Sequence, residues 1–208
     1  PITPKLFRVS DVGERVVESE LYVSAGRSEL LVGERDRFCA FPIDATEPEW
    51  CAAVSRPASA PLQRALARDA SRAYRTIDDS GQLCTWMGSG SQPPTCVDPP
   101  EGQRLVTLSK HGEYVVTREG TELCVWQSTM LGASFKPSCL EASRESTVHL
   151  VSDDGRKLAL ETGGRGALYD LRTRAPELDL GVVQDRWERT VLSDDGGLLA
   201  IVLGSAAV

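Results

Sequence analysis

Six cysteines carry the most specific chemistry in this sequence, and they fall into three pairs of similar spacing: Cys39 and Cys51, Cys84 and Cys96, and Cys124 and Cys139. Each pair could form a disulfide that closes a short loop, or stay as two reduced thiols that pack as small hydrophobic groups. Zinc is not expected, because the chain has no C-x-x-C motif and its two histidines match no ligand spacing.

The histidines do not indicate catalysis. His111 falls in a predicted hairpin turn, a position that is normally solvated, and His149 falls in an apolar strand where it faces solvent or a neighbour. Neither has a nucleophile and a third group at a readable spacing, which a catalytic triad would need.

Paired acids and one glycine-rich run are the remaining candidates for chemistry. Paired carboxylates can act as general acid and base or bind calcium, but Asp153-Asp154 and Asp194-Asp195 recur in predicted turns, where turn geometry explains them. Asp78-Asp79 lies in a different kind of turn and is more open to a functional role. The run at 162–166 lacks the Lys and Ser or Thr of a phosphate-binding loop. We predict no catalytic residue, no cofactor and no metal site.

The elements that must position these residues repeat with a period of about 42 residues. Each copy begins with an apolar run, a Ser or its counterpart, a polar turn and a second apolar run, and Asp-Gly in that turn favours a tight hairpin. A third run with an aromatic residue and a fourth short run that often contains Cys follow. The pattern predicts four short strands per unit, and the units lie at about 19–53, 62–98, 103–141 and 147–181, with partial units at 1–18 and 188–208.

The cysteine pairs fall on the predicted third and fourth strands of three units. Residues that face each other across an antiparallel ladder have Cβ atoms about 4.5–5.5 Å apart, and small adjustments bring them within bonding distance. Disulfides would place the chain in an oxidising compartment, and reduced thiols would favour the cytoplasm. Both possibilities remain open at the level of sequence.

Four-stranded units of this size bury their faces only by stacking, and radial stacking leaves few exposed edges. The sequence resembles the WD-repeat β-propellers in its period, its Ser-x-Asp-Gly hairpin and its aromatic third strand, over roughly 19–203. We therefore predict an all-β chain with a single domain over 1–208, a β-propeller of four-stranded antiparallel blades. It has about five blades, closed by strands at 6–9 and 14–17, or is a fragment of a larger propeller, as trimmed-looking ends suggest.

The resemblance is incomplete. The Trp-Asp pair of the family occurs only as Tyr169-Asp170, and no Gly-His dipeptide precedes a repeat. The resemblance therefore gives no support for the family's buried Asp-His-Ser-Trp hydrogen-bond network in this chain.

The amino-acid composition limits the kinds of partner that the chain is expected to bind. Thirty acidic against 23 basic residues give a net charge of −7, which disfavours nucleic acid because phosphate binding needs a basic surface. No stretch approaches the roughly 18 apolar residues of a membrane helix, so no membrane span is expected.

The resemblance implies a partner-binding face made by the loops between second and third strands and by the connections between units. Carried onto this chain, that face includes Arg35, Arg37, Asp79, Arg118, Arg165 and Trp187. We predict a non-catalytic scaffold or recognition module with a protein or peptide partner. The alternatives are a secreted, disulfide-stapled ligand binder and, with weaker support, a propeller hydrolase or lactonase.

Overall fold

The computed structural model describes residues 20–23, 29–33, 37–42, 47–48, 50–53, 63–66, 73–77, 81–87, 93–133, 136–182, 187–192, 196–197 and 199–203. The chain divides into two compact units, Pro1–Val54 and Ser55–Val208, and each is described by itself. Within the described ranges, no helix has the length and apolar character needed to cross a membrane.

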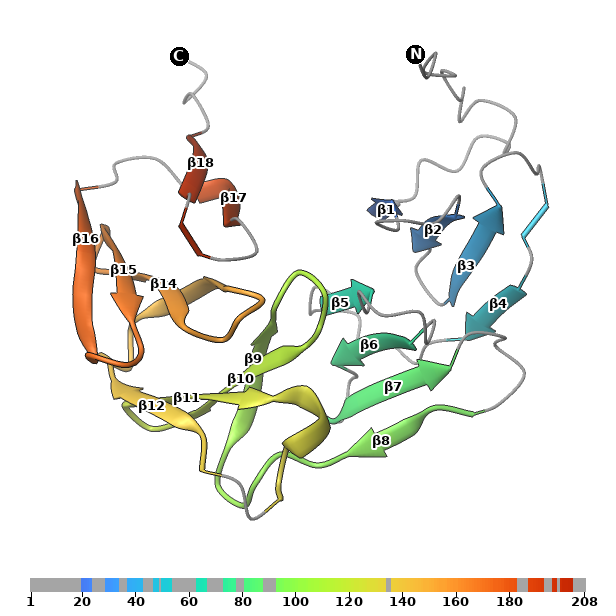
Figure 1. Cartoon of the computed structure of the whole chain (residues 1–208), viewed down its shortest axis with the longest axis horizontal. Helices are drawn as coiled ribbons and strands as arrows, with labels where there is room; N and C mark the ends of the chain where they lie inside the picture. The colour runs from blue at the N-terminus through green and yellow to red at the C-terminus, as the bar shows by residue number, and fades with distance from the viewer. Residues whose placement is uncertain are drawn as a thin grey trace. The chain divides into compact units, whose positions relative to one another are not determined.

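The first unit contains one four-stranded antiparallel sheet in the order β1-β2-β3-β4 (Figure 1). Its strands are β1 (Glu20–Val23), β2 (Glu29–Gly33), β3 (Arg37–Pro42) and β4 (Trp50–Ala53). Each strand pairs with the next in the chain, so the sheet needs only short connections.

The second unit repeats this arrangement three times and adds a two-stranded sheet. The second sheet holds β5 (Gln63–Leu66), β6 (Ala73–Ile77), β7 (Leu83–Met87) and β8 (Thr95–Val97). The third holds β9 (Arg104–Leu108), β10 (Tyr114–Glu119), β11 (Glu122–Gln127) and β12 (Ser138–Glu141), with the short 3-10 helix η2 (Ser128–Met130) between the last two strands. The fourth holds β13 (Thr147–Val151), β14 (Lys157–Thr162), β15 (Arg165–Asp170) and β16 (Ala175–Val182), and the fifth holds β17 (Trp187–Leu192) and β18 (Leu199–Leu203).

The first strands of successive sheets lie next to each other within the second unit. β9 contacts both β5 and β13, and β13 also contacts β17. This is the arrangement of blades around a propeller axis, and the predicted fold class is confirmed. The segments 6–9 and 14–17, predicted to complete the last blade, lie outside the described residues.

Hydrophobic cores fill the spaces on both faces of the third sheet. Toward the fourth sheet, Val116, Leu123, Val125 and Leu140 pack against Val151, Leu158, Leu160 and Leu171. Toward the second sheet, Val115, Cys124 and Trp126 pack with Leu83, Leu108 and Leu131. Because successive strand residues point to opposite faces, burial of both faces explains the nearly continuous apolar runs of β10 and β11.

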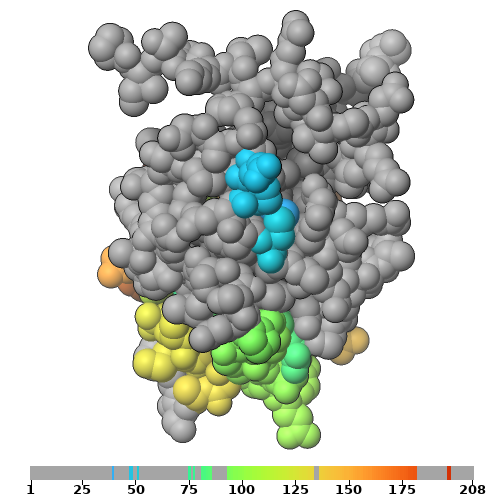
Figure 2. Space-filling model, turned by 90° about the vertical axis from the view of Figure 1, so that its right-hand side faces the viewer, coloured from blue at the N-terminus to red at the C-terminus, as the bar shows by residue number. Residues whose placement is uncertain are grey.

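The connection between β11 and β12 extends toward the second sheet. A Cβ atom at Gly132 would lie 3.9 Å from the carbonyl oxygen of Asp98, which follows β8. In Figure 2 the green surface around residues 93–100 adjoins the yellow surface of the β11–β12 region. The edge of the second sheet is therefore covered in part by the third.

Glycine residues permit the backbone conformation of the hairpin turns. The run at 162–166 is a two-residue turn in which Gly163 and Gly164 have φ angles of 55° and 75°, and Thr162 pairs with Arg165 across it. Positive φ at both central residues is the requirement of a type I′ hairpin turn, whose twist matches that of the strands. The run thus serves the backbone, as its lack of phosphate-loop residues predicts.

In the fourth and fifth sheets, the first hairpin also contacts the preceding sheet. The turn between β13 and β14 presents Gly155 directly to the ring of Tyr114 in β10, and a Cβ atom at Gly155 would lie 2.3 Å from Cε1 of that ring. Gly196 takes the corresponding position against Lys157 of β14, with 2.6 Å from a Cβ atom to the lysine Cγ. The repeated glycine is therefore required by packing between neighbouring sheets as well as by the turn.

Candidate protein-interaction surface

The six cysteines form three disulfides between paired strands. Cys39 bonds to Cys51, Cys84 to Cys96 and Cys124 to Cys139, with Sγ–Sγ distances of 2.04, 2.05 and 2.10 Å. In each pair the two residues are direct register partners on the third and fourth strands of their sheet. Each disulfide therefore fastens the outermost strand of a sheet to its neighbour.

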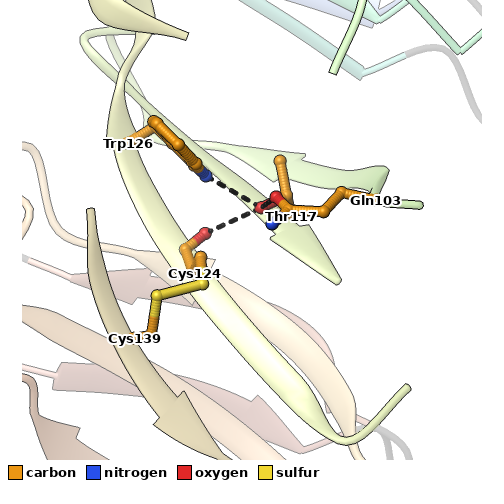
Figure 3. The surroundings of a disulfide bond; sticks show 5 residues. All are labelled: Gln103, Thr117, Cys124, Trp126 and Cys139. Atoms are coloured by element: carbon orange, nitrogen blue, oxygen red, sulfur yellow. Dashed lines mark hydrogen bonds between the residues drawn. A yellow bond between two sulfur atoms is a disulfide. The ribbon is translucent and has the colours of Figure 1, made fainter. Parts of the chain in front are cut away.

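A buried hydrogen-bond network joins the second and third strands of the third sheet (Figure 3). The indole N–H of Trp126 donates to the hydroxyl of Thr117 at 2.9 Å, and this hydroxyl donates to Oε1 of Gln103 at 2.6 Å. Trp126 and Thr117 are both buried. This network consists of Thr117, Trp126 and Gln103, and so differs from the Asp-His-Ser-Trp network of the family.

Removing that hydroxyl is expected to destabilise the third sheet. In Thr117→Val, the Trp126 N–H and the Gln103 oxygen both lose their partner while side-chain volume is kept, and we expect a loss of about 1–3 kcal/mol in the free energy of unfolding, measured with urea. The matched control is Thr107→Val, another buried threonine of the same sheet, whose hydroxyl makes one hydrogen bond to the residues that the structure describes, a long one of 3.4 Å to the Leu108 carbonyl oxygen. Equal costs for the two variants would contradict a role of the network.

His111 is buried, although its place in a turn predicted solvent exposure. Its backbone N–H donates to Oδ1 of Asp153 at 2.9 Å, and its Nδ1 lies 2.6 Å from Oδ2 of the same carboxylate. Asp153 belongs to the corresponding turn of the next sheet. Asp154 has a role within its own turn, because its Oδ1 accepts a hydrogen bond from the Ser152 hydroxyl. Asp153 instead links two sheets, which the geometry of its turn does not explain.

Tyr169-Asp170, the counterpart of the family's Trp-Asp pair, places a buried carboxylate among cations. Asp170 accepts from the guanidinium of Arg172 at 3.1 Å, from the backbone N–H of Arg172 at 2.8 Å and from Nζ of Lys157 at 3.0 Å. The Arg172 hydrogen bonds, followed by that of Lys157, hold the pKa of Asp170 far below its usual range. Lys157 also contacts Glu177 of β16, so the network connects β14, β15 and β16.

This network predicts a pH dependence of stability. A carboxylate whose pKa is lower in the folded than in the unfolded chain stabilises the fold above the unfolded pKa of about 4, and the contribution is lost as the pH falls. Urea unfolding at pH 7 and at acidic pH should therefore show a smaller change for Asp170→Asn than for the parent chain. Asp179→Asn is the comparison and should reduce the acid dependence less: the Gly181 N–H and then Arg165 lower the pKa of this carboxyl, but it is exposed and solvent screens these interactions. If Asp170→Asn leaves the acid dependence as in the parent, the assignment is wrong.

The residues predicted for the partner-binding face differ in their surroundings. Arg118 is only 7% exposed, and its guanidinium donates to the carbonyl oxygens of Arg144 and Ser146 at 3.0 and 2.7 Å. Its Nε is the one buried side-chain polar atom in the described part of the chain that has no hydrogen-bond partner. Burial and the neighbouring Arg104 lower the pKa of Arg118. Arg118 thus fixes the connection between the third and fourth sheets, and its head is not presented to solvent.

Arg165 is exposed at the β14–β15 turn and pairs with Asp179 of β16 at 2.9 Å. Arg37 begins β3 and Trp187 begins β17, and the placement of both side chains lies outside what the structure describes. Arg35 and Asp79 lie outside the described residues. As a binding face, the set remains a prediction.

His149 is half-buried in β13, and its Nε2 lies 3.0 Å from Oε2 of Glu161. Within the described residues, one group of possible metal ligands comes close together, namely Glu122, Cys124 and Cys139, with ligand atoms within 4.8 Å of one another. In the structure both sulfurs of this group are joined in a disulfide and offer no thiolate.

Comparison with known proteins identifies the fold. The β-propeller domain of Cps50 (Swd1) from Myceliophteria thermophila superimposes with a TM-score of 0.63 at 13% identity, over 91% of this chain and 63% of that chain. A chain of the mitotic checkpoint complex superimposes with a TM-score of 0.56 at 14% identity, over 88% of this chain and 59% of that chain. No family model and no curated protein matches the sequence.

The chain has the fold of WD-repeat-like β-propellers, in agreement with the resemblance seen in its repeats. It spans 63% and 59% of the length of the two chains that it matches. Fold likeness of this kind leaves function to be argued from the chain's own surface.

Proposed function

We propose that this chain is a non-catalytic protein-interaction scaffold, which presents the ends of its sheets to a protein or peptide partner. The observation that carries the proposal is how the buried polar groups are used. His111, Asp153, Arg118 and Asp170 all bind neighbouring parts of the chain, and each fixes a turn or a connection at the end of a sheet. Rigid loops on a rigid scaffold are a common basis of recognition.

The proposed face contains the β14–β15 turn, where Arg165 is 60% exposed. An exposed guanidinium can form paired hydrogen bonds with a partner's carboxylate, and arginine is enriched at the centres of interfaces. Within the second unit, Trp187 is the predicted aromatic anchor of this face, and Arg37 is the candidate at the corresponding end of the sheet in the first unit.

Charge reversal at the two ends of one strand tests the proposal. Arg165→Glu alters the proposed face, and Arg156→Glu alters the turn that begins β14, at its opposite end. Both arginines are similarly exposed, at 60% and 62%, and each faces an aspartate, Asp179 or Asp154. We expect Arg165→Glu to remove partners captured by chemical crosslinking and mass spectrometry, while Arg156→Glu retains them. Loss of the same partners in both variants, or in neither, would contradict the assignment of the face.

A second candidate function is favoured by the three disulfides: a ligand-binding propeller in an extracytoplasmic compartment, where such bonds persist. The test is mass spectrometry of the denatured chain, isolated without reductant from its native source and alkylated before digestion. We expect all six cysteines in the pairs 39–51, 84–96 and 124–139. Six free thiols would contradict this location and leave the scaffold in a reducing compartment.

A further inference from the structure

Three glutamates face one another in a row across the third sheet. Glu119 of β10 pairs in register with Glu122 of β11, which pairs in turn with Glu141 of β12. All three are exposed, and none forms an ion pair with another residue that the structure describes. Like charges directly opposite one another destabilise a sheet, so this row would be stabilised by a bound cation.

The next row on the same face of the sheet contains the Cys124–Cys139 disulfide (Figure 3). Residues two apart in a strand point to the same face, so Glu122 and Cys124 lie side by side, as do Cys139 and Glu141. The carboxylate of Glu122 and the two sulfurs have ligand atoms within 4.8 Å of one another. Two sulfurs and a carboxylate thus converge at one end of the sheet.

The second sheet shows that the arrangement is particular to the third. There, the residues two positions before Cys84 and two positions after Cys96 are Gln82 and Asp98, and the Gln82 amide donates to the Asp98 carboxylate at 2.8 Å. A neutral amide and a carboxylate satisfy each other without a cation. At the corresponding place in the third sheet, two glutamates lie opposite each other in register.

We propose that reduction of the Cys124–Cys139 disulfide converts this end of the third sheet into a zinc site, with both thiolates and the Glu122 carboxylate as ligands. A dithiol reductant supplies two electrons and two protons, which leave two thiols on the protein and a disulfide on the reductant. Zn²⁺ then displaces the two thiol protons and binds the thiolates. Zinc binds cysteine sulfur and carboxylate oxygen with tetrahedral geometry, and water or Glu141 takes the fourth position.

The burial of the two cysteines favours stable binding of zinc at this site. Cys124 is 3% exposed and Cys139 is half-buried, while both glutamates reach solvent. The thiolates would therefore be shielded on one side, and the metal could enter from the glutamate side. The +2 charge of zinc would offset repulsion within the glutamate row. In the oxidised chain the sulfurs are poor ligands, so metal binding depends on redox state. This inference does not rest on the proposed function.

The experiment uses the whole chain, oxidised or reduced with a phosphine, incubated with zinc sulfate and desalted. We expect the reduced chain to retain one zinc ion and the oxidised chain none, measured by elemental analysis. Alkylation followed by mass spectrometry should show that zinc protects Cys124 and Cys139, and leaves the labelling of the other four thiols unchanged. Zinc retention by the oxidised chain, or equal protection of all three pairs, would overturn the proposal.

Matched variants test the carboxylate. Glu122→Gln should weaken zinc binding by the reduced chain at least about tenfold, since even residues that only support a ligand cost this much. Glu145→Gln removes an exposed acid from the β12–β13 connection and should leave zinc affinity unchanged. Circular dichroism monitors folding of each reduced chain. Equal affinities for the two variants, or a chain that unfolds on reduction and is not restored by zinc, would also overturn the proposal.

Discussion

Gly155→Ala is expected to lower the free energy of unfolding by about 3 kcal/mol or more, among the largest effects of any single methyl group in this chain. Two costs combine. Gly155 has a φ angle of 68°, a region that alanine adopts at a cost of about 1 kcal/mol. Its new Cβ atom would also lie 2.3 Å from Cε1 of Tyr114, so the turn between β13 and β14 and the third sheet would have to separate.

Gly163→Ala separates these two costs. Gly163 also has a positive φ angle, 55°, but nothing lies within 4 Å of the position of its Cβ atom. We expect a loss of only about 1 kcal/mol there. In a chain that carries Tyr114→Ala, the cost of Gly155→Ala should fall toward that of Gly163→Ala, because the ring is absent. Similar costs for the two alanine variants in the parent chain, measured by urea unfolding, would show that the contact with Tyr114 is unimportant.

Loss of the Cys124–Cys139 disulfide is expected to cost about 3 kcal/mol, because the bond restricts the unfolded chain between residues 15 positions apart. The measurement is urea unfolding of the double variant Cys124→Ala/Cys139→Ala against the oxidised parent. Alanine keeps the buried position of Cys124 apolar, so the chain is expected to fold.

The matched comparison is Cys84→Ala/Cys96→Ala. Its cysteines are 12 positions apart, and Cys84 is as well buried as Cys124. The chain-entropy model therefore predicts nearly the same cost for both pairs, within about 0.5 kcal/mol. Costs that differ by several-fold would show that local packing, and not restriction of the unfolded chain, determines what these bonds contribute.

The strand pattern was readable from local sequence. Alternation of apolar residues, Asp-Gly turns and a constant period are properties of consecutive residues, and they predicted β13 and β14 on either side of the turn at Gly155. The cysteine pairing followed from the same period, because residues at equivalent places on neighbouring strands meet. The aromatic residue of the third run belongs to the same pattern, and in the third sheet this residue is Trp126, which is buried.

The polar contacts were harder to predict. His111 was expected in solvent, but it is buried against Asp153 of the next sheet. Arg118 was predicted for a binding face, and the sequence did not show that its guanidinium is buried and donates to the carbonyl oxygen of Ser146. Gln103 was not singled out, although its side chain accepts a hydrogen bond from the buried Thr117 hydroxyl.

Local sequence was enough to predict the all-β class, the four-stranded unit, the turn glycines and the pairs of cysteines, because each depends on residues joined by short stretches of chain. The folded structure was needed to show which polar groups meet between sheets, such as His111 with Asp153, and which like charges lie opposite each other within a sheet, such as Glu122 and Glu141. Contacts between sheets depend on how the sheets stack and on small register shifts, such as the one at Val116 and Thr117. A one-residue shift reverses the face to which a side chain points, and a repeat period known only to within a few residues does not resolve it.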